Sequence, residues 1–131
     1  MYTRAVLHLV FLLISAGVFI GCGNPTANSL ERAATPKPKE AATQLELAFA
    51  GADAGVKSYA TVASLALQKA DYEAAVQALQ TLKAQGNLTM DQGLAVHNAM
   101  IALEARLISA MDAGDANAQR AYEQLKKARR N

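Results

Sequence analysis

Apolar residues recur at intervals of three and four along most of the chain after residue 38. That spacing places side chains on one face of an α-helix. Glycine and aspartate separate the apolar segments, and both are common where helices end and begin. No segment alternates apolar and polar residues as a half-buried strand does. The pattern predicts an all-α fold, a small alanine-rich bundle with helices over residues 39–50, 56–69, 72–85, 90–112 and 116–129.

Each predicted helix has one apolar face that we expect to pack inward. In chain order these faces are Ala41, Ala42, Leu45, Ala48 and Phe49; Tyr59, Val62, Ala63, Ala66 and Leu67; Tyr72, Ala75, Val76, Leu79 and Leu82; Val96, Met100, Leu103, Leu107 and Met111; and Ala118, Ala121, Tyr122, Leu125 and Ala128. The fourth helix is the longest, and Leu94, Ile101 and Ile108 widen its apolar stripe. We therefore predict that it is the core of the bundle, with neighbours on two sides.

Polar residues at the predicted helix starts have the identities and spacing of caps. Four carboxylates fall at predicted helix ends, where they can accept hydrogen bonds from free backbone N–H groups and complement the helix dipole: Asp53, Asp71, Asp91 and Asp115. Thr89 and Gln92 have the spacing of a capping box, in which each side chain bonds the other residue's backbone. We assign these carboxylates to helix capping rather than to catalysis.

The second and third helices combine small and aromatic residues in a recurring order. The residues concerned are Tyr59, Val62, Ala63, Ala66, Ala70-Asp71-Tyr72, Ala75-Val76 and Leu79. In this order the pair resembles one tetratricopeptide repeat, which implies a hairpin of two closely crossing helices. Ala70 stands where that family favours Gly, and Asn87 where it favours Pro. The next helix is too long to continue the repeat, so an ordinary alanine-rich hairpin is the alternative.

The first 22 residues have a different pattern. Arg4 is followed by an apolar run that ends in Phe19-Ile20-Gly21-Cys22. A charged start, an apolar middle and a small residue before the cut are the parts of a secretory signal. These last four residues resemble the lipobox of bacterial lipoproteins, although that family usually has Leu where Phe19 stands. Cys22 is the only cysteine, so it cannot close a disulfide within the chain.

The lipobox resemblance implies cleavage before Cys22 and attachment of a diacylglycerol to its thiol. The chain then divides into a signal peptide over residues 1–21, a lipidated cysteine and flexible tether over 22–38, and a helical domain over 39–131. Two alternatives remain, namely ordinary signal cleavage after Gly17 and an uncleaved membrane helix. The apolar run of residues 5–21 falls slightly short of the roughly 20 residues that such a helix needs.

The same resemblance implies a protein of the cell envelope that faces the periplasm or the exterior. Two or more acyl chains hold a protein stably on a membrane. Gly23 follows the cysteine, where the family's inner-membrane retention signal has Asp. The outer membrane is therefore favoured, if the source has one.

The charged residues indicate no particular partner, because 13 Lys and Arg nearly balance 11 Asp and Glu. Four cations do gather at the C-terminus: Lys126, Lys127, Arg129 and Arg130. Such a run suits a solvated helix end, whose negative dipole it complements. Alternatively, it contacts anionic lipid headgroups or envelope polymers. Nucleic acid is not an expected partner outside the cytoplasm.

No residue pattern indicates catalysis. His97 is the only histidine after the signal, and no second and third ligand with suitable spacing accompanies it. Ser58, Ser64 and Ser109 lie on predicted helices, away from any strained strand-to-helix turn. We expect no catalytic residue, metal, cofactor or small-molecule substrate, and a structural or partly exposed His97. The expected role is a binding or scaffolding module for another envelope protein. A passive spacer is the alternative, and an enzyme comes third.

Overall fold

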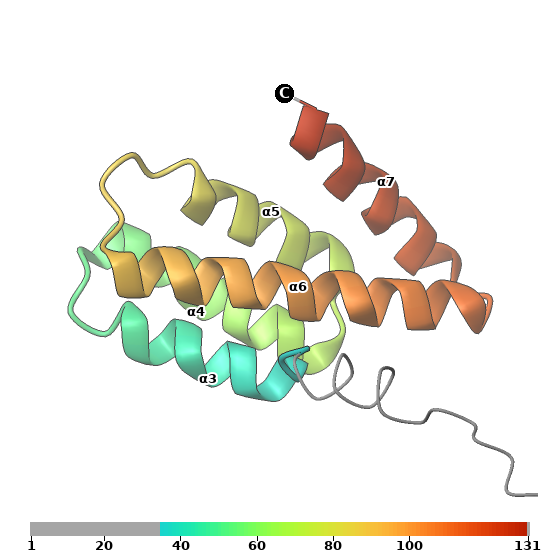
Figure 1. Ribbon diagram of the computed structural model, residues 1–131, viewed down its shortest axis with the longest axis horizontal. Coiled ribbons are helices and arrows are strands. Elements are labelled where there is room, and N and C mark those ends of the chain that lie inside the picture. The colour runs from blue at the N-terminus through green and yellow to red at the C-terminus, as the bar shows by residue number, and fades with distance from the viewer. Residues whose placement is uncertain (1–34, 131) are drawn as a thin grey trace, which may run out of the picture.

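The computed structural model describes residues 35–130, so Cys22 and most of the predicted tether lie outside the described residues. The described chain is helical and without strands, which confirms the predicted all-α bundle (Figure 1). Its helices lie within about two residues of their predicted bounds. They are α3 (Pro38–Ala48), α4 (Ala54–Lys69), α5 (Tyr72–Lys83), α6 (Met90–Asp112) and α7 (Ala116–Arg130).

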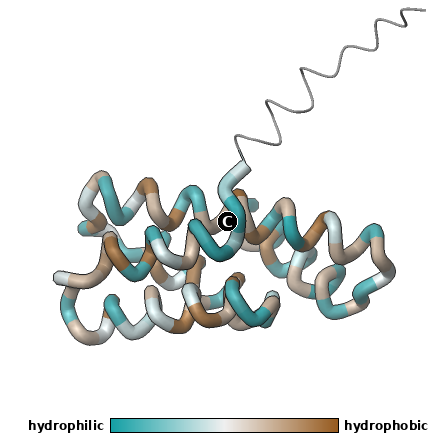
Figure 2. The backbone as a smooth tube through the Cα atoms, turned by 90° about the horizontal axis from the view of Figure 1, so that it is seen from below, coloured by the Kyte–Doolittle hydropathy of each residue, from teal (hydrophilic) through white to brown (hydrophobic). Residues whose placement is uncertain are grey.

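Four of the helices close into a ring. Helix α3 packs against α4 and α6, and α5 packs against the same two helices from the other side. Helix α7 lies outside the ring and packs on both α5 and α6, obliquely to them (Figure 1). Hydrophobic positions recur along the helices at roughly the spacing of a turn (Figure 2). Helix α6 thus contacts three neighbours, as expected of the core helix.

Alanine supplies more than half of the buried hydrophobic residues in the described part of the chain. Small side chains let helix backbones approach closely, so a few large residues fill the remaining volume. The largest fully buried side chains are Phe49, Leu45, Leu67, Leu79, Leu82, Leu103, Leu107, Leu125 and Val76. Most of the predicted inward faces of α3, α5, α6 and α7 are therefore confirmed, with Met100 and Met111 half-buried.

The predicted inward face of α4 is partly wrong. Tyr59 and Val62 are each 44% exposed, whereas Ala60, Ala63 and Leu67 are buried. Helix α4 packs mainly on α3 and α5, and the face that meets them is rotated away from Tyr59 and Val62. These two exposed residues belong to the tetratricopeptide-like pattern. The packing therefore gives that resemblance no support.

Most of the predicted caps are present. The N–H of Gln92 donates to Thr89 Oγ1 at 3.2 Å, and the N–H of Thr89 donates to Gln92 Oε1 at 3.1 Å, which confirms the capping box. Asp71 accepts from the N–H of Ala74 at 3.2 Å. The prediction for Asp53 is wrong, because its side chain makes no capping hydrogen bond.

Ala70, at the end of α4, has an unfavourable backbone conformation. Its φ of 59° is left-handed, where a Cβ clashes with the following carbonyl. We expect Ala70→Gly to stabilise the domain by up to about 1 kcal/mol, because relief of this strain outweighs the added freedom of the unfolded chain. Thermal melts would show a rise of a few degrees. Ala84→Gly is the control: Ala84 is right-handed, so glycine should lower the melting temperature there. Equal shifts for both variants would contradict the strain argument.

Candidate functional site

A mainly apolar hollow on the described surface lies between α5, α6 and α7. Two adjoining cavities of about 320 and 380 Å³ share Lys83, Met100 and Arg129. Val96, Met100 and Ile101 of α6 line its base. We call this feature the α5–α7 groove. It exists because α5 and α7 both pack on α6 but diverge toward their C-terminal ends (Figure 1).

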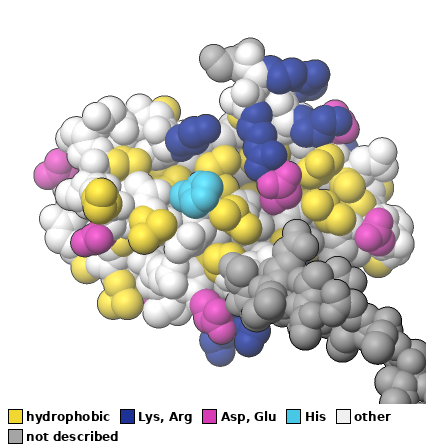
Figure 3. All heavy atoms as spheres, viewed as in Figure 1, with side chains coloured by type: hydrophobic (Ala, Val, Ile, Leu, Met, Phe, Trp, Pro, Cys, Tyr) yellow, Lys and Arg dark blue, Asp and Glu magenta, His cyan; other side chains and the backbone are white. Residues whose placement is uncertain are grey.

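Helix α6 also carries an exposed apolar stripe that continues from the groove along its outer face. Met90 is 89% exposed, Leu94 56% and Ile108 43%, and Ile101 is half-buried between them. The expectation that neighbours would cover Leu94 and Ile108 is therefore wrong. The three neighbours of α6 occupy its other sides, so this face has no partner within the described chain. Figure 3 shows hydrophobic side chains along this face, with Lys and Arg gathered above them.

Lys83 and Arg129 line the groove, no Asp or Glu lines it, and the carboxylate of Glu104 stands at its rim, paired with Arg129. Lys83 makes no ion pair within residues 35–130. Arg129 donates from Nη1 to Glu104 Oε1 at 2.9 Å and from Nη2 to Oε2. These hydrogen bonds outweigh partial desolvation and raise the pKa of Arg129 above its ordinary value. The guanidinium therefore stays charged across the neutral range, and the stability linked to its charge is lost as the pH rises through that raised pKa.

His97 lines the groove and is exposed, which agrees with the expected exposed histidine. It makes no hydrogen bond or ion pair within the described residues. Among those residues, no group of three His, Cys, Asp or Glu side chains could hold a metal ion. His97 therefore has the surroundings of a surface residue beside an apolar groove.

Of the four predicted C-terminal cations, two have a carboxylate partner in the described part of the chain and two have none. Lys126 bonds Glu123 at 3.1 Å and stands 5.7 Å from the centre of the Tyr122 ring, while Arg129 pairs with Glu104. Lys127 and Arg130 are exposed without an ion pair in the described part of the chain. Half of the predicted anionic-contact set therefore already has carboxylate partners.

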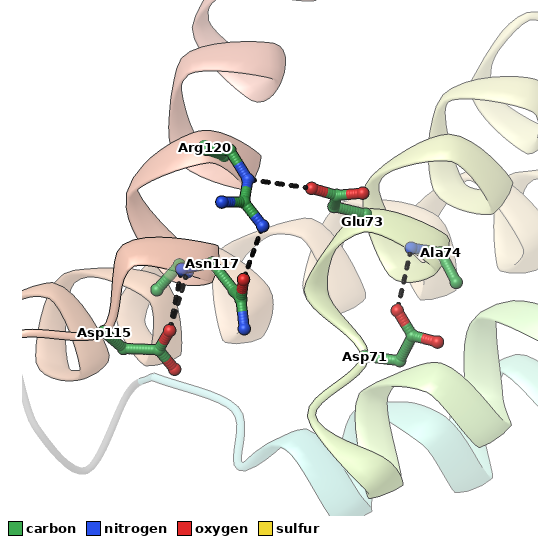
Figure 4. Close-up of polar contacts among 7 residues, drawn as sticks. Asp71, Glu73, Ala74, Asp115, Asn117 and Arg120 are labelled. Atoms are coloured by element: carbon green, nitrogen blue, oxygen red, sulfur yellow. Dashed lines mark hydrogen bonds and ion pairs between the residues drawn. The ribbon is translucent and has the colours of Figure 1, made fainter.

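A polar cleft of about 370 Å³ lies where α5 and α7 begin (Figure 4). Asp115 accepts from the N–H groups of Asn117 and Ala118 at 2.8 and 3.2 Å, so it caps α7 as predicted. Arg120 reaches across the cleft to Glu73 of α5 at 3.5 Å and also bonds Asn117. These polar groups already have partners within the chain, and the exposed Arg120–Glu73 pair links α7 to α5 across the cleft.

Ser64 is the one fully buried polar residue within the described range. Its hydroxyl donates to Glu46 of α3 and accepts from Gln68 Nε2 at 3.2 Å. Ser64 is fully buried, so a substrate cannot reach its hydroxyl in this structure. The three residues form a polar link between α3 and α4.

Helix α6 is long and apolar enough to cross a membrane by length and composition alone. Core helices of soluble proteins satisfy the same criterion. Ala99, Leu103 and Leu107 of α6 are buried inside the bundle, so its apolar character has a structural reason.

Sequence reasoning identified Arg129 from the local run of cations but did not identify Lys83 as its neighbour in the groove. Lys83 is a single lysine in the last turn of α5, where cations are common. Nothing in the local sequence distinguishes it. Comparison of the chain with protein-family models, with curated proteins and with solved structures finds no match.

Proposed function

We propose that the chain is a lipid-anchored protein of the bacterial cell envelope whose helical bundle binds another envelope protein. The anchor rests on the signal-like segment that ends at Cys22. The binding role rests on one observation: the α5–α7 groove and the adjoining α6 stripe leave large apolar side chains in solvent beside unpaired Lys83. A contiguous apolar surface with a polar rim is typical of an interaction site.

A passive spacer is the second candidate. The ion pairs of Lys126 and Arg129 favour it, because they occupy half of the cations that would contact anionic lipid or polymer. A spacer would gain nothing from exposing Met90 and Leu94, however, and exposed apolar area promotes aggregation. The binding role therefore accounts for more of the surface.

The proposed anchor predicts the chemical state of the mature N-terminus. Mass spectrometry should find a chain that begins at Cys22 and carries a diacylglycerol, because acyl chains are what hold such a protein on the membrane. Cys22→Ser should leave the precursor uncleaved. An unmodified Cys22, or a wild-type chain that still begins at Met1, would contradict the anchor. If the source has an outer membrane, fractionation should place the protein there, and a wholly inner-membrane protein would contradict that assignment.

The proposed binding role can be tested by crosslinking in living cells. Benzoylphenylalanine would replace Ile101 in the groove and, as the control, Tyr59 on the outer face of α4. Both positions are accessible, but only Ile101 belongs to the groove. We expect one discrete protein adduct from position 101 and none from position 59. The absence of an adduct at 101, or the same adducts from both positions, would favour the spacer.

A further inference from the structure

We infer that the occupant of the α5–α7 groove is an amphipathic helix with carboxylates beside its apolar face. This inference rests on the proposed binding role and names the chemistry of the partner. It draws on three observations: the shape of the groove, the length of the α6 stripe and the charge of the rim.

The shape and length fit a helix. Val96 is buried and Met100 half-buried at the base of the groove, while Lys83 of α5 and Arg129 of α7 line its two sides. Helix α6 and its two diverging neighbours thus leave a trough of the kind that one more helix fills. From Met90 to Ile108 the exposed stripe spans about 27 Å, since a helix rises about 1.5 Å per residue. A partner helix of five turns would cover it.

The charges fit an acidic partner. Lys83 lacks a carboxylate partner within the described chain, and no Asp or Glu lines the groove. Arg129 binds Glu104 at the rim and can still present its exposed edge to a second carboxylate. Complementary charges steer an approaching partner and disfavour those of the wrong sign. Carboxylates on both flanks of an apolar helix face would meet Lys83 on one side and Arg129 on the other.

Other occupants fit less well. A second copy of the chain docked face to face would bring two sets of Lys83 and Arg129 together. The chain's own residues 1–34 contain a single carboxylate, Glu31, and so cannot supply two acidic flanks. A lipid bilayer is flat and would not reach Val96 and Met100 at the base of the groove. A small ligand would remain largely in solvent, whereas ligand sites bury most of the ligand.

The test uses the full chain in phosphatidylcholine nanodiscs and two fluorescent synthetic helices of about 20 residues. Both helices carry the same leucine face; one has Glu on the flanks and the other has Lys. We expect the Glu helix to bind at least about tenfold more tightly than the Lys helix. Lys83→Glu should weaken the Glu helix about tenfold and strengthen the Lys helix. Lys69→Glu, on the exposed end of α4, is the matched charge control and should change neither.

A second pair of variants tests the apolar contact. Ile101→Glu should abolish binding of the Glu helix, whereas Val62→Glu, at an exposed apolar site on α4, should leave it intact. Thermal melts would confirm that each variant is folded. Equal affinity for both helices, no effect of Lys83→Glu, or loss of binding only with Val62→Glu would overturn the inference. So would a dimer of the free chain in light scattering that Ile101→Glu dissociates, since a second copy would then be the occupant.

The two proposals fail in distinguishable ways. If Ile101 crosslinks to a protein in cells while neither synthetic helix binds, the binding role stands and the partner chemistry is wrong. If the Glu helix binds with the expected charge dependence but position 101 forms no adduct in cells, the groove chemistry stands and the envelope role is wrong.

Discussion

Leu107→Ala is expected to lower the free energy of unfolding by about 2–5 kcal/mol, whereas Leu94→Ala, on the same helix, should cost less than about 1 kcal/mol. The chemical change is identical in the two variants, but the surroundings differ. Leu107 is fully buried in the bundle, so truncation removes packing contacts and leaves a cavity. Leu94 is mostly in solvent, so truncation leaves no cavity. Leu103→Ala should behave like Leu107→Ala, because Leu103 is equally buried.

Denaturant titration of the three variants would measure these differences directly. For a domain of about 100 residues, 1 kcal/mol corresponds to about 4–8 °C in melting temperature. Leu107→Ala should therefore lower the melting temperature by roughly 10 °C or more. His97→Ala should change it little, since His97 is exposed and makes no hydrogen bond in the described structure. Similar losses for Leu94→Ala and Leu107→Ala would mean that the outer face of α6 is covered in solution.

Phe49→Ala should be the most damaging single truncation, at about 3–5 kcal/mol. Phe49 is the largest fully buried side chain among the described residues. It follows α3 directly, and its N–H still donates to the carbonyl of Leu45 at 3.1 Å. Its ring belongs to the hydrophobic core at the point where α3 ends. Alanine would leave a cavity that the backbone, held by this hydrogen bond, cannot easily close.

Two further variants provide reference values for the destabilisation by Phe49→Ala. Leu47→Ala is the neighbouring control and should be nearly neutral, because Leu47 is 72% exposed. Phe49→Leu should lie between the two, since leucine refills part of the volume. A loss below about 1 kcal/mol for Phe49→Ala would show that the connection after α3 contributes little to the core.

The parts of the fold that sequence predicted well are those decided by neighbouring residues. The capping box of Thr89 and Gln92 is local, because its two partners are three residues apart. The recurrence of apolar residues every three or four positions is local in the same sense. Burial is not local: Tyr59 and Leu94 lie on apolar helical faces, yet they stay exposed because no neighbouring helix covers those faces. Periodicity shows that a face is apolar without showing that another element covers it.

The candidate site likewise has features that the local sequence predicts and features that depend on long-range contacts. Arg129 belongs to a visible run of cations, so a charge count finds it. Its pairing with Glu104 requires α7 to pack on α6, and its place opposite Lys83 requires α5 and α7 to pack side by side on α6. Both depend on contacts between residues far apart in the chain. Local sequence therefore indicates positive charge at the C-terminus but not the groove that this charge borders.

The abundance of alanine in the core has a consequence for how freely this sequence can vary. A buried alanine loses no rotamer freedom when the chain folds, but it leaves no space for a larger side chain. Ala63 and Ala99, both fully buried, should reject almost every substitution except glycine or serine. Phe49 and the buried leucines should instead reject anything smaller. Saturation mutagenesis of the domain would then separate the core positions into two classes. One class would tolerate no larger side chain and the other no smaller one, and few core positions would tolerate both.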